Sequence, residues 1–201
     1  MIKNCKILIF FLPFFLIFAF KAKANQLEIA EDLVKDVSSN AIEILSNKED
    51  SEKEKFEAFR NLLDENVDTN LIAKFVIKSY WKDLTSEQQE EFINLFKIYI
   101  IKSYSLKLNS YSGETISITG SKKLNEKYIL VNSNILKEDQ NSGIRIDWRV
   151  KINNENMKIV DLIVEGISLA LAQRAEFTSI IENNNGDTEV LISKLQTFID
   201  N

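Results

Sequence analysis

The sequence predicts an α+β protein in which helices cover an antiparallel β-sheet of about four to five strands. Apolar residues recur every three or four positions between residues 27 and 109 and again after residue 168, which is the period of amphipathic helices. Between residues 114 and 167, apolar and polar residues alternate instead, which is the period of strands with one buried face. Helices followed by consecutive strands and then by further helices are the order expected of an α+β fold.

The first 24 residues precede this pattern and predict a cleavable secretory signal. Lys3 and Lys6 lead into an apolar run of 14 residues, 7–20, and Ala22-Lys23-Ala24 places small residues where a signal peptidase cleaves. The run is shorter than the roughly 20 apolar residues of a membrane-spanning helix. We therefore expect residues 1–24 to be removed on export and residues 25–201 to form a single domain.

Composition excludes several classes of function. Four of the 25 basic residues lie in the predicted signal, so the exported chain holds 21 basic and 30 acidic residues and a net charge of −9, against −5 for the whole chain. The chain has no histidine, and its single cysteine, Cys5, lies in the signal. Disulfides in the exported chain, the usual zinc and haem sites, and Ser-His-Asp or Cys-His catalysis are thereby excluded. The acidic charge argues against nucleic-acid binding, and no cofactor is expected.

The helical regions have recognisable starts. We expect helices over residues 27–45 and 52–64, and a third that Asp68 caps. Thr85 followed by Gln88 three residues later forms a capping-box pattern. It opens the longest predicted helix, residues 86–109, which carries a row of large apolar side chains: Phe92, Leu95, Phe96, Tyr99, Ile100, Tyr104 and Leu108. Two further helices, about 168–182 and 187–199, close the chain.

The strands are expected around residues 116–118 and over 128–136, 144–152 and 157–165. In the third strand, Ile146, Trp148 and Val150 alternate with charged residues, which predicts one apolar face and one wet face. An apolar face must be covered, and the long helix 86–109 is the covering element that we expect. Its aromatic residues would then face this third strand.

Two stretches of the sequence go beyond composition. In the first, Tyr80-Trp81 precedes Thr85-Ser86-Glu87-Gln88, and Phe92 and Phe96 follow four and eight residues beyond Gln88. In the second, after Trp148, Ile159-Val160-Asp161-Leu162 precedes Glu165-Gly166-Ile167-Ser168-Leu169, and then Arg174 and Phe177. In order and spacing, these stretches resemble the MlaC family, also called toluene-tolerance proteins. The chain departs from the family pattern at Lys78, where the family usually has glycine, and at Gln173, where it usually has an aromatic residue.

The resemblance implies a periplasmic phospholipid carrier that is not an enzyme and whose only bound molecule is its cargo. It implies an NTF2-like sheet subdomain, about residues 114–167, and a helical part, about residues 25–110 and 168–201, with the acyl tails between them. Its implied partners are an inner-membrane ABC transporter with an MCE-domain ring and an outer-membrane lipoprotein–porin complex, between which lipid moves to maintain outer-membrane lipid asymmetry. The acidic surface suits electrostatic docking to basic patches on such partners.

Under this resemblance the candidate lipid contacts are large apolar side chains and one arginine. They are Tyr80, Trp81, Phe92, Phe96, Tyr99, Ile100, Tyr104, Val131, Ile146, Trp148, Val150, Arg174 and Phe177. The alternative for each apolar residue is ordinary core packing, since an apolar wall and a packed core use the same residue types. For Arg174 the alternatives are a lipid phosphate or a salt bridge to Glu176, Asp161 or Glu165.

Other functions remain open from the sequence. A carrier of a hopanoid or another apolar lipid needs similar walls. An NTF2-like enzyme acting on a hydrophobic substrate needs a carboxylate or tyrosine as base on the apolar side of the sheet, and Asp147 lies in register with the charged face instead. A protein-interaction module or a signal-anchored protein is the remaining alternative.

Overall fold

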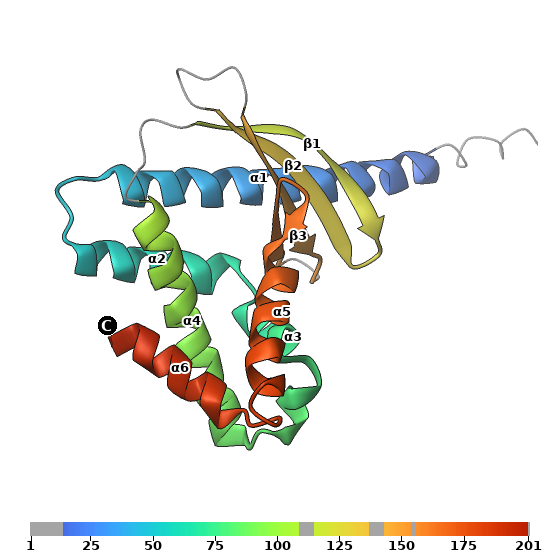
Figure 1. Ribbon diagram of the computed structural model, residues 1–201. Helices are drawn as coiled ribbons and strands as arrows, with labels where there is room; N and C mark the ends of the chain where they lie inside the picture. Colours follow the sequence, from blue (N-terminus) through green and yellow to red (C-terminus); the bar gives the residue numbers. More distant parts are fainter. Residues whose placement is uncertain (1–13, 109–114, 137–142, 154–155, 201) are drawn as a thin grey trace, which may run out of the picture.

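The structure, a computed structural model, describes residues 14–108, 115–136, 143–153 and 156–200, with side chains described for 26–103 and for the later ranges. Within these ranges six α-helices, one 3-10 helix and a five-stranded antiparallel sheet follow one another as helices, strands and helices (Figure 1). The predicted α+β class and the four to five strands are therefore confirmed.

The helices begin where their capping residues predict. The elements before the sheet are α1 (Phe14–Ser46), α2 (Glu52–Asn66), α3 (Thr69–Ile77), the 3-10 helix η1 (Lys78–Asp83) and α4 (Ser86–Leu108); α5 (Leu169–Glu182) and α6 (Glu189–Asp200) follow it. Asp68 accepts a hydrogen bond from the Leu71 amide, and Thr85 and Gln88 exchange the two bonds of a capping box.

Helix α1 begins inside the predicted signal and continues through residue 24. Cleavage after Ala24 thus stays a prediction. None of the helices in the described ranges carries an apolar stretch of the length that a membrane span requires.

The sheet is a simple meander. Its strands β1 (Thr115–Asn125), β2 (Tyr128–Leu136), β3 (Ile144–Lys151), β4 (Lys158–Val164) and β5 (Ile167–Ser168) pair in sequence order. The turn between β4 and β5 has two central residues, Glu165 and Gly166, with φ of 48° and 84°. Positive φ at both positions is the requirement of a type I′ turn, and glycine at the second position meets it without strain.

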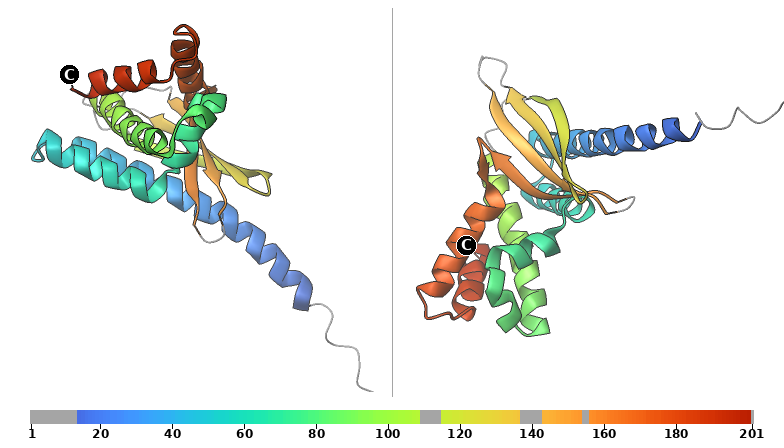
Figure 2. Two further views of the ribbon diagram at one scale, coloured as in Figure 1. Left: turned by 90° about the horizontal axis from the view of Figure 1, so that it is seen from below. Right: turned by 90° about the vertical axis from the view of Figure 1, so that its right-hand side faces the viewer.

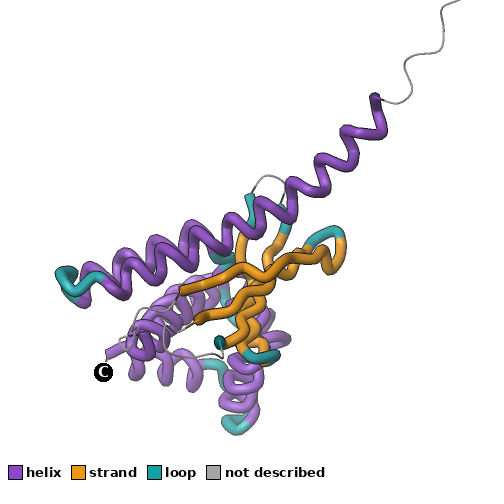
Figure 3. Tube along the Cα trace, turned by 90° about the horizontal axis from the view of Figure 1, so that it is seen from above, coloured by secondary structure: helices purple, strands orange, loops and turns teal. Residues whose placement is uncertain are grey.

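Helix α1, rather than α4, covers the apolar face of the sheet, so the predicted covering element is wrong. We call this apolar side the inner face; its residues Val131, Trp148 and Val150 pack in one core with Ala30 and Val34 of α1. Figure 3 shows α1 crossing the strands. The physical reason lies in side-chain size, because alanine and valine on α1 allow the helix axis to approach the sheet closely. We call the cluster that α1 forms with the inner face of the sheet the sheet core.

A second core joins α3, α4, α5 and α6, which lie below the sheet and α1 in the right-hand view of Figure 2. It is centred on Phe177 of α5, whose ring lies 6.2 Å from that of Phe92, 6.0 Å from that of Phe96 and 5.7 Å from that of Tyr99. The Phe92 and Phe96 rings meet Phe177 at 76°, an edge-to-face arrangement that favours such ring pairs. We call this cluster the helical core. The bulky side chains Phe92, Leu95 and Phe96 of α4 are buried in it.

The turn between α3 and η1 carries backbone strain at Lys78, where the MlaC pattern usually has glycine. Lys78 has φ of 54° and ψ of −119°, a combination that side chains disfavour. Lys78→Gly is expected to raise the free energy of unfolding by about 1 kcal/mol, since relief of roughly 1–3 kcal/mol of strain exceeds the entropic cost of glycine. Urea denaturation measures this, with Lys78→Ala as the control; an equal gain in the alanine variant would assign the effect to the lysine side chain.

Candidate functional site

The structure divides the predicted site residues between the two cores. Tyr80, Trp81, Phe92, Phe96, Tyr99, Ile100 and Phe177 belong to the helical core. Val131, Ile146, Trp148 and Val150 belong to the sheet core. The prediction that the aromatic row of α4 packs against β3 is therefore wrong for Phe92, Phe96, Tyr99 and Ile100. Tyr104 lies in α4, but its side chain is outside the described residues.

Several predicted contacts are ordinary core residues. The side chains of Phe92, Phe96 and Phe177 are each 1% exposed, and Val131 and Val150 are fully buried. Trp148 is fixed by its indole N–H, which donates to Ser133 Oγ over 2.9 Å, while Ser133 donates to the Ile146 carbonyl over 2.8 Å. These residues stabilise the fold. Half-buried residues such as Tyr99, Ile100 and Ile146 have exposed surface that can contact a ligand.

Beyond the sheet core, one end of the inner face keeps its apolar side chains partly exposed. Ile144 and Ile146 continue the row of Trp148 and Val150, and their cross-strand partners are Ile135 and Val164. Ile167 pairs with Val164 in turn. We call these five residues the apolar sheet end.

Exposure distinguishes the apolar sheet end from the cores. Ile144 is 46% exposed and Ile167 is 64% exposed, and of the five residues only Ile146 packs against a core cluster. Aliphatic side chains gathered on a surface are typical of binding sites. Only Ile146 among them was a predicted lipid contact, because alternation predicts which face of the sheet a residue joins but not which end of that face stays exposed.

Gly143 keeps this end of the sheet tightly paired. A Cβ at position 143 would lie 2.7 Å from the carbonyl oxygen of Ile135 and 2.8 Å from a methyl of Leu136. Glycine is therefore required at the start of β3, where the backbone passes close to β2. This close approach places Ile144 opposite Ile135.

The second sequence motif has a structural role. Asp161 accepts hydrogen bonds from Ser168 Oγ (2.7 Å) and the Ala170 amide (3.1 Å), and the Arg149 guanidinium lies 3.4 Å from its carboxylate. The carboxylate thus caps α5 and ties it to β3. Glu165 accepts a hydrogen bond from the Arg145 amide. Both carboxylates have structural partners, which weakens the interpretation of either as a catalytic base.

Arg174 does not form the predicted salt bridge. Asp161 is paired with Arg149, Glu165 binds the Arg145 amide, and Glu176 accepts from Gln173. The Arg174 guanidinium instead lies 4.9 Å from the centre of the Phe75 ring, a cation–π contact. A contact between Arg174 and a lipid phosphate stays a prediction.

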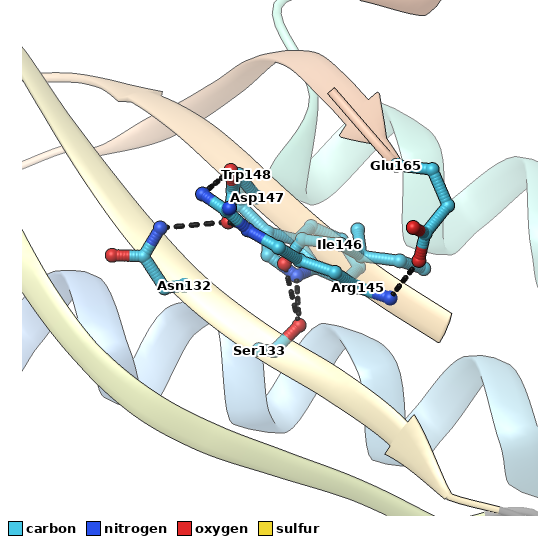
Figure 4. Close-up of polar contacts among 7 residues, drawn as sticks. All are labelled: Asn132, Ser133, Arg145, Ile146, Asp147, Trp148 and Glu165. Atoms are coloured by element: carbon cyan, nitrogen blue, oxygen red, sulfur yellow. Dashed lines mark hydrogen bonds and ion pairs between the residues drawn. The ribbon is translucent and has the colours of Figure 1, made fainter. Parts of the chain in front are cut away.

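On the outer face of the sheet, a buried carboxylate organises a polar network (Figure 4). Asp147, 4% exposed, accepts from Asn132 over 2.6 Å and from two nitrogens of Arg145 over 3.0 and 2.6 Å. Burial alone raises the pKa of Asp147, but the hydrogen bonds from Arg145 and Asn132 outweigh it and hold this pKa below its ordinary value. The hydrogen bonds from Arg145 to Asp147 also raise the pKa of Arg145.

This network makes stability depend on pH in the acid range. The pKa of Asp147 is lower in the folded chain than in the unfolded chain, where it is about 3.9. The ionised carboxylate therefore adds to the free energy of unfolding above this unfolded pKa, and this contribution is lost as the pH falls through the folded pKa. Wild type is expected to unfold at higher urea than Asp147→Asn at pH 6, with the gap narrowing below about pH 4. A gap that stays constant down to pH 3 would contradict this assignment.

Two grooves indent the helical surface. One, of about 320 Å³, lies between α1 and α2 and is floored by Ile44 and Leu62. The other, of about 380 Å³, lies between α3, η1 and α4 and is lined by Trp81 and Ile93 among polar residues. Trp81 also has the Lys74 ammonium 5.3 Å from its ring centre.

The geometry is that of a small α+β protein that presents an apolar surface at one end of its sheet. Within the described ranges no group of acidic or sulfur-bearing residues is arranged to hold a metal ion. A family model described as "MlaC protein" matches residues 35–197. The chain therefore belongs to the MlaC family.

Individual relatives agree with this assignment. The chain is 28% identical over 140 residues to the intermembrane phospholipid transport system binding protein MlaC of Haemophilus influenzae, in an alignment that covers 68% of this chain and 64% of the relative. It thus spans a little under two thirds of that relative's length. A solved structure of a phospholipid-binding protein from Ralstonia solanacearum, in complex with a phospholipid, has the same fold, with a TM-score of 0.73, 18% identity and coverage of 85% of this chain and 97% of that one.

Proposed function

We propose that this protein carries a phospholipid, with acyl tails packed against the apolar sheet end. The observation that carries the proposal is the row of partly exposed aliphatic residues there, in which Ile144 is 46% and Ile167 is 64% exposed. Membership of the MlaC family supports it, as do the names of the two relatives.

Aliphatic walls are sufficient for this task. An acyl chain offers no polar group, and each methylene removed from water contributes roughly 0.8 kcal/mol. Of the half-buried members of the predicted set, Ile146 lies in the apolar sheet end and is the candidate contact for the tails there. Tyr80, Trp81, Tyr99 and Ile100 pack against the helical core with Phe92, Phe96 and Phe177, and they are candidate contacts only for a ligand that reaches the helices. Arg174 is the candidate for the phosphate.

The protein acts as a carrier and not as an enzyme. An NTF2-like enzyme would need a free base near the apolar surface, but the carboxylates of Asp147 and Asp161 are engaged by arginines and other hydrogen-bond donors. We further propose that it works in the periplasm after removal of residues 1–24. There it would exchange lipid between an inner-membrane ABC transporter with an MCE-domain ring and an outer-membrane lipoprotein–porin complex, and so maintain outer-membrane lipid asymmetry.

Native mass spectrometry of the exported protein, purified without detergent, tests the proposal. A stoichiometric adduct of phospholipid mass that is released on denaturation is the expected result. An adduct of hopanoid or other lipid mass would assign a different cargo to the same surface. A lipid-free protein that takes nothing from added liposomes would overturn the carrier function, and the mass also shows whether residues 1–24 are gone.

A further inference from the structure

Charge in this chain is divided between the sheet and the helices. The strand-bearing segments, residues 115–136, 143–153 and 156–164, hold seven basic and three acidic residues, a net charge of +4. The helical segments, residues 26–108 and 165–200, hold 13 basic and 23 acidic residues, a net charge of −10. A protein with a net charge of −5 thus has a cationic sheet.

The cations of the sheet gather on its outer face. Register places Arg149 opposite Asp161 and Lys151 opposite Lys158. Lys122 of β1 lies opposite Leu130 of β2, which lies opposite Arg149 in turn. We call the resulting row across β1, β3 and β4 the cationic stripe; it consists of Lys122, Arg145, Arg149, Lys151 and Lys158. The two carboxylates beneath it, Asp147 and Asp161, are only 4% and 5% exposed, whereas the Arg145 side chain is 59% exposed.

Two lysines of the stripe depend on partners outside the sheet. Lys151 and Lys158 lie directly opposite each other, and like charges in this position destabilise a sheet. Each lysine is held by a group outside the sheet: Lys151 by Asp68 over 2.9 Å, and Lys158 by the backbone carbonyl of Glu65. The five cations face three paired carboxylates, Asp68, Asp147 and Asp161, so the stripe keeps a net charge of +2 for a partner.

We propose that the cationic stripe docks an acidic surface of a protein partner. Arg145 and Arg149 are oriented by buried carboxylates, and a guanidinium fixed in direction suits carboxylates fixed in a protein surface. Between the cations, the outer face carries Leu130, which is only 9% exposed, beside the polar Asn132 and Asn134, so the stripe offers no exposed apolar anchor of the kind that a lipid surface would take. An anionic bilayer would also extend beneath the acidic helices and repel them, whereas a partner of limited size faces the stripe alone.

The test rests on the proposed function, because it uses the two partner complexes proposed above as probes. Lys122→Glu combined with Lys158→Gln makes the stripe more negative by three charges. Lys53→Glu with Lys194→Gln changes the charge equally at exposed helical positions and is the matched control. Binding of each protein to the immobilised MCE-domain ring, to the lipoprotein–porin complex and to phosphatidylglycerol vesicles is measured at low and high salt.

The expected result is a loss of at least tenfold in affinity of the stripe variant for one of the two complexes, strongest at low salt, with less than threefold change in the control. Unchanged binding to both complexes, or a loss confined to the vesicles, would overturn the proposal. The phospholipid content of each protein is recorded alongside. A lipid-free wild type would instead count against the carrier function and leave the docking result standing.

Discussion

Replacing Ile144 with aspartate is expected to reduce the bound phospholipid at least tenfold while leaving the fold intact. Under the proposed function, the substitution sets a carboxylate against an acyl tail at the apolar sheet end, and burying an unpaired charge costs several kcal/mol, where 1.4 kcal/mol already corresponds to tenfold. Ile144 is 46% exposed, so its own loss should change the free energy of unfolding by no more than about 0.5 kcal/mol.

Leu124→Asp provides the control for this experiment. Leu124 is 43% exposed, almost the same as Ile144, but it lies near the turn between β1 and β2, away from the apolar sheet end. Lipid extracted per mole of protein should fall for Ile144→Asp and remain at the wild-type level for Leu124→Asp. Equal lipid content in the two variants would place the tails elsewhere, and the grooves beside α1 and α3 would become the next candidates.

Local sequence signals predicted much of this fold. The caps at Asp68 and Thr85 mark the starts of α3 and α4 because they act through hydrogen bonds between residues three apart. Alternation in β3 correctly separated an apolar from a charged face, because it depends only on the two-residue period of a strand. These features depend on neighbours in the chain.

What the sequence did not predict depends on contacts between distant residues. Whether α1 or α4 covers the sheet depends on how closely each helix can approach it. The many large apolar residues of α4 favoured that helix as the predicted cover, but they pack in the helical core. For the same reason the predicted lipid contacts came from two separate cores. Phe96 and Trp148 are both large aromatic residues, but Phe96 packs in the helical core and Trp148 in the sheet core. The apolar sheet end is defined by the exposed fractions of its side chains, which depend on the packing of distant elements and do not follow from the alternation of residues.

Trp148→Ala is expected to have the largest effect on stability, lowering the free energy of unfolding by about 3–5 kcal/mol. The indole is 8% exposed beneath α1, and its removal leaves a cavity between that helix and the sheet. It also removes the donor to Ser133, although Ser133 still donates to the Ile146 carbonyl. Urea denaturation of the two proteins measures the difference.

Trp148→Phe separates packing from hydrogen bonding. Phenylalanine keeps most of the ring and loses the N–H bond to Ser133, so a cost of about 1–2 kcal/mol is expected. The phospholipid content of the folded alanine variant also decides whether Trp148 is core or wall. Because α1 covers it, we expect the folded fraction to keep its lipid; a variant that is stable but empty would show that the indole contacts the tails directly and would move the site beneath α1.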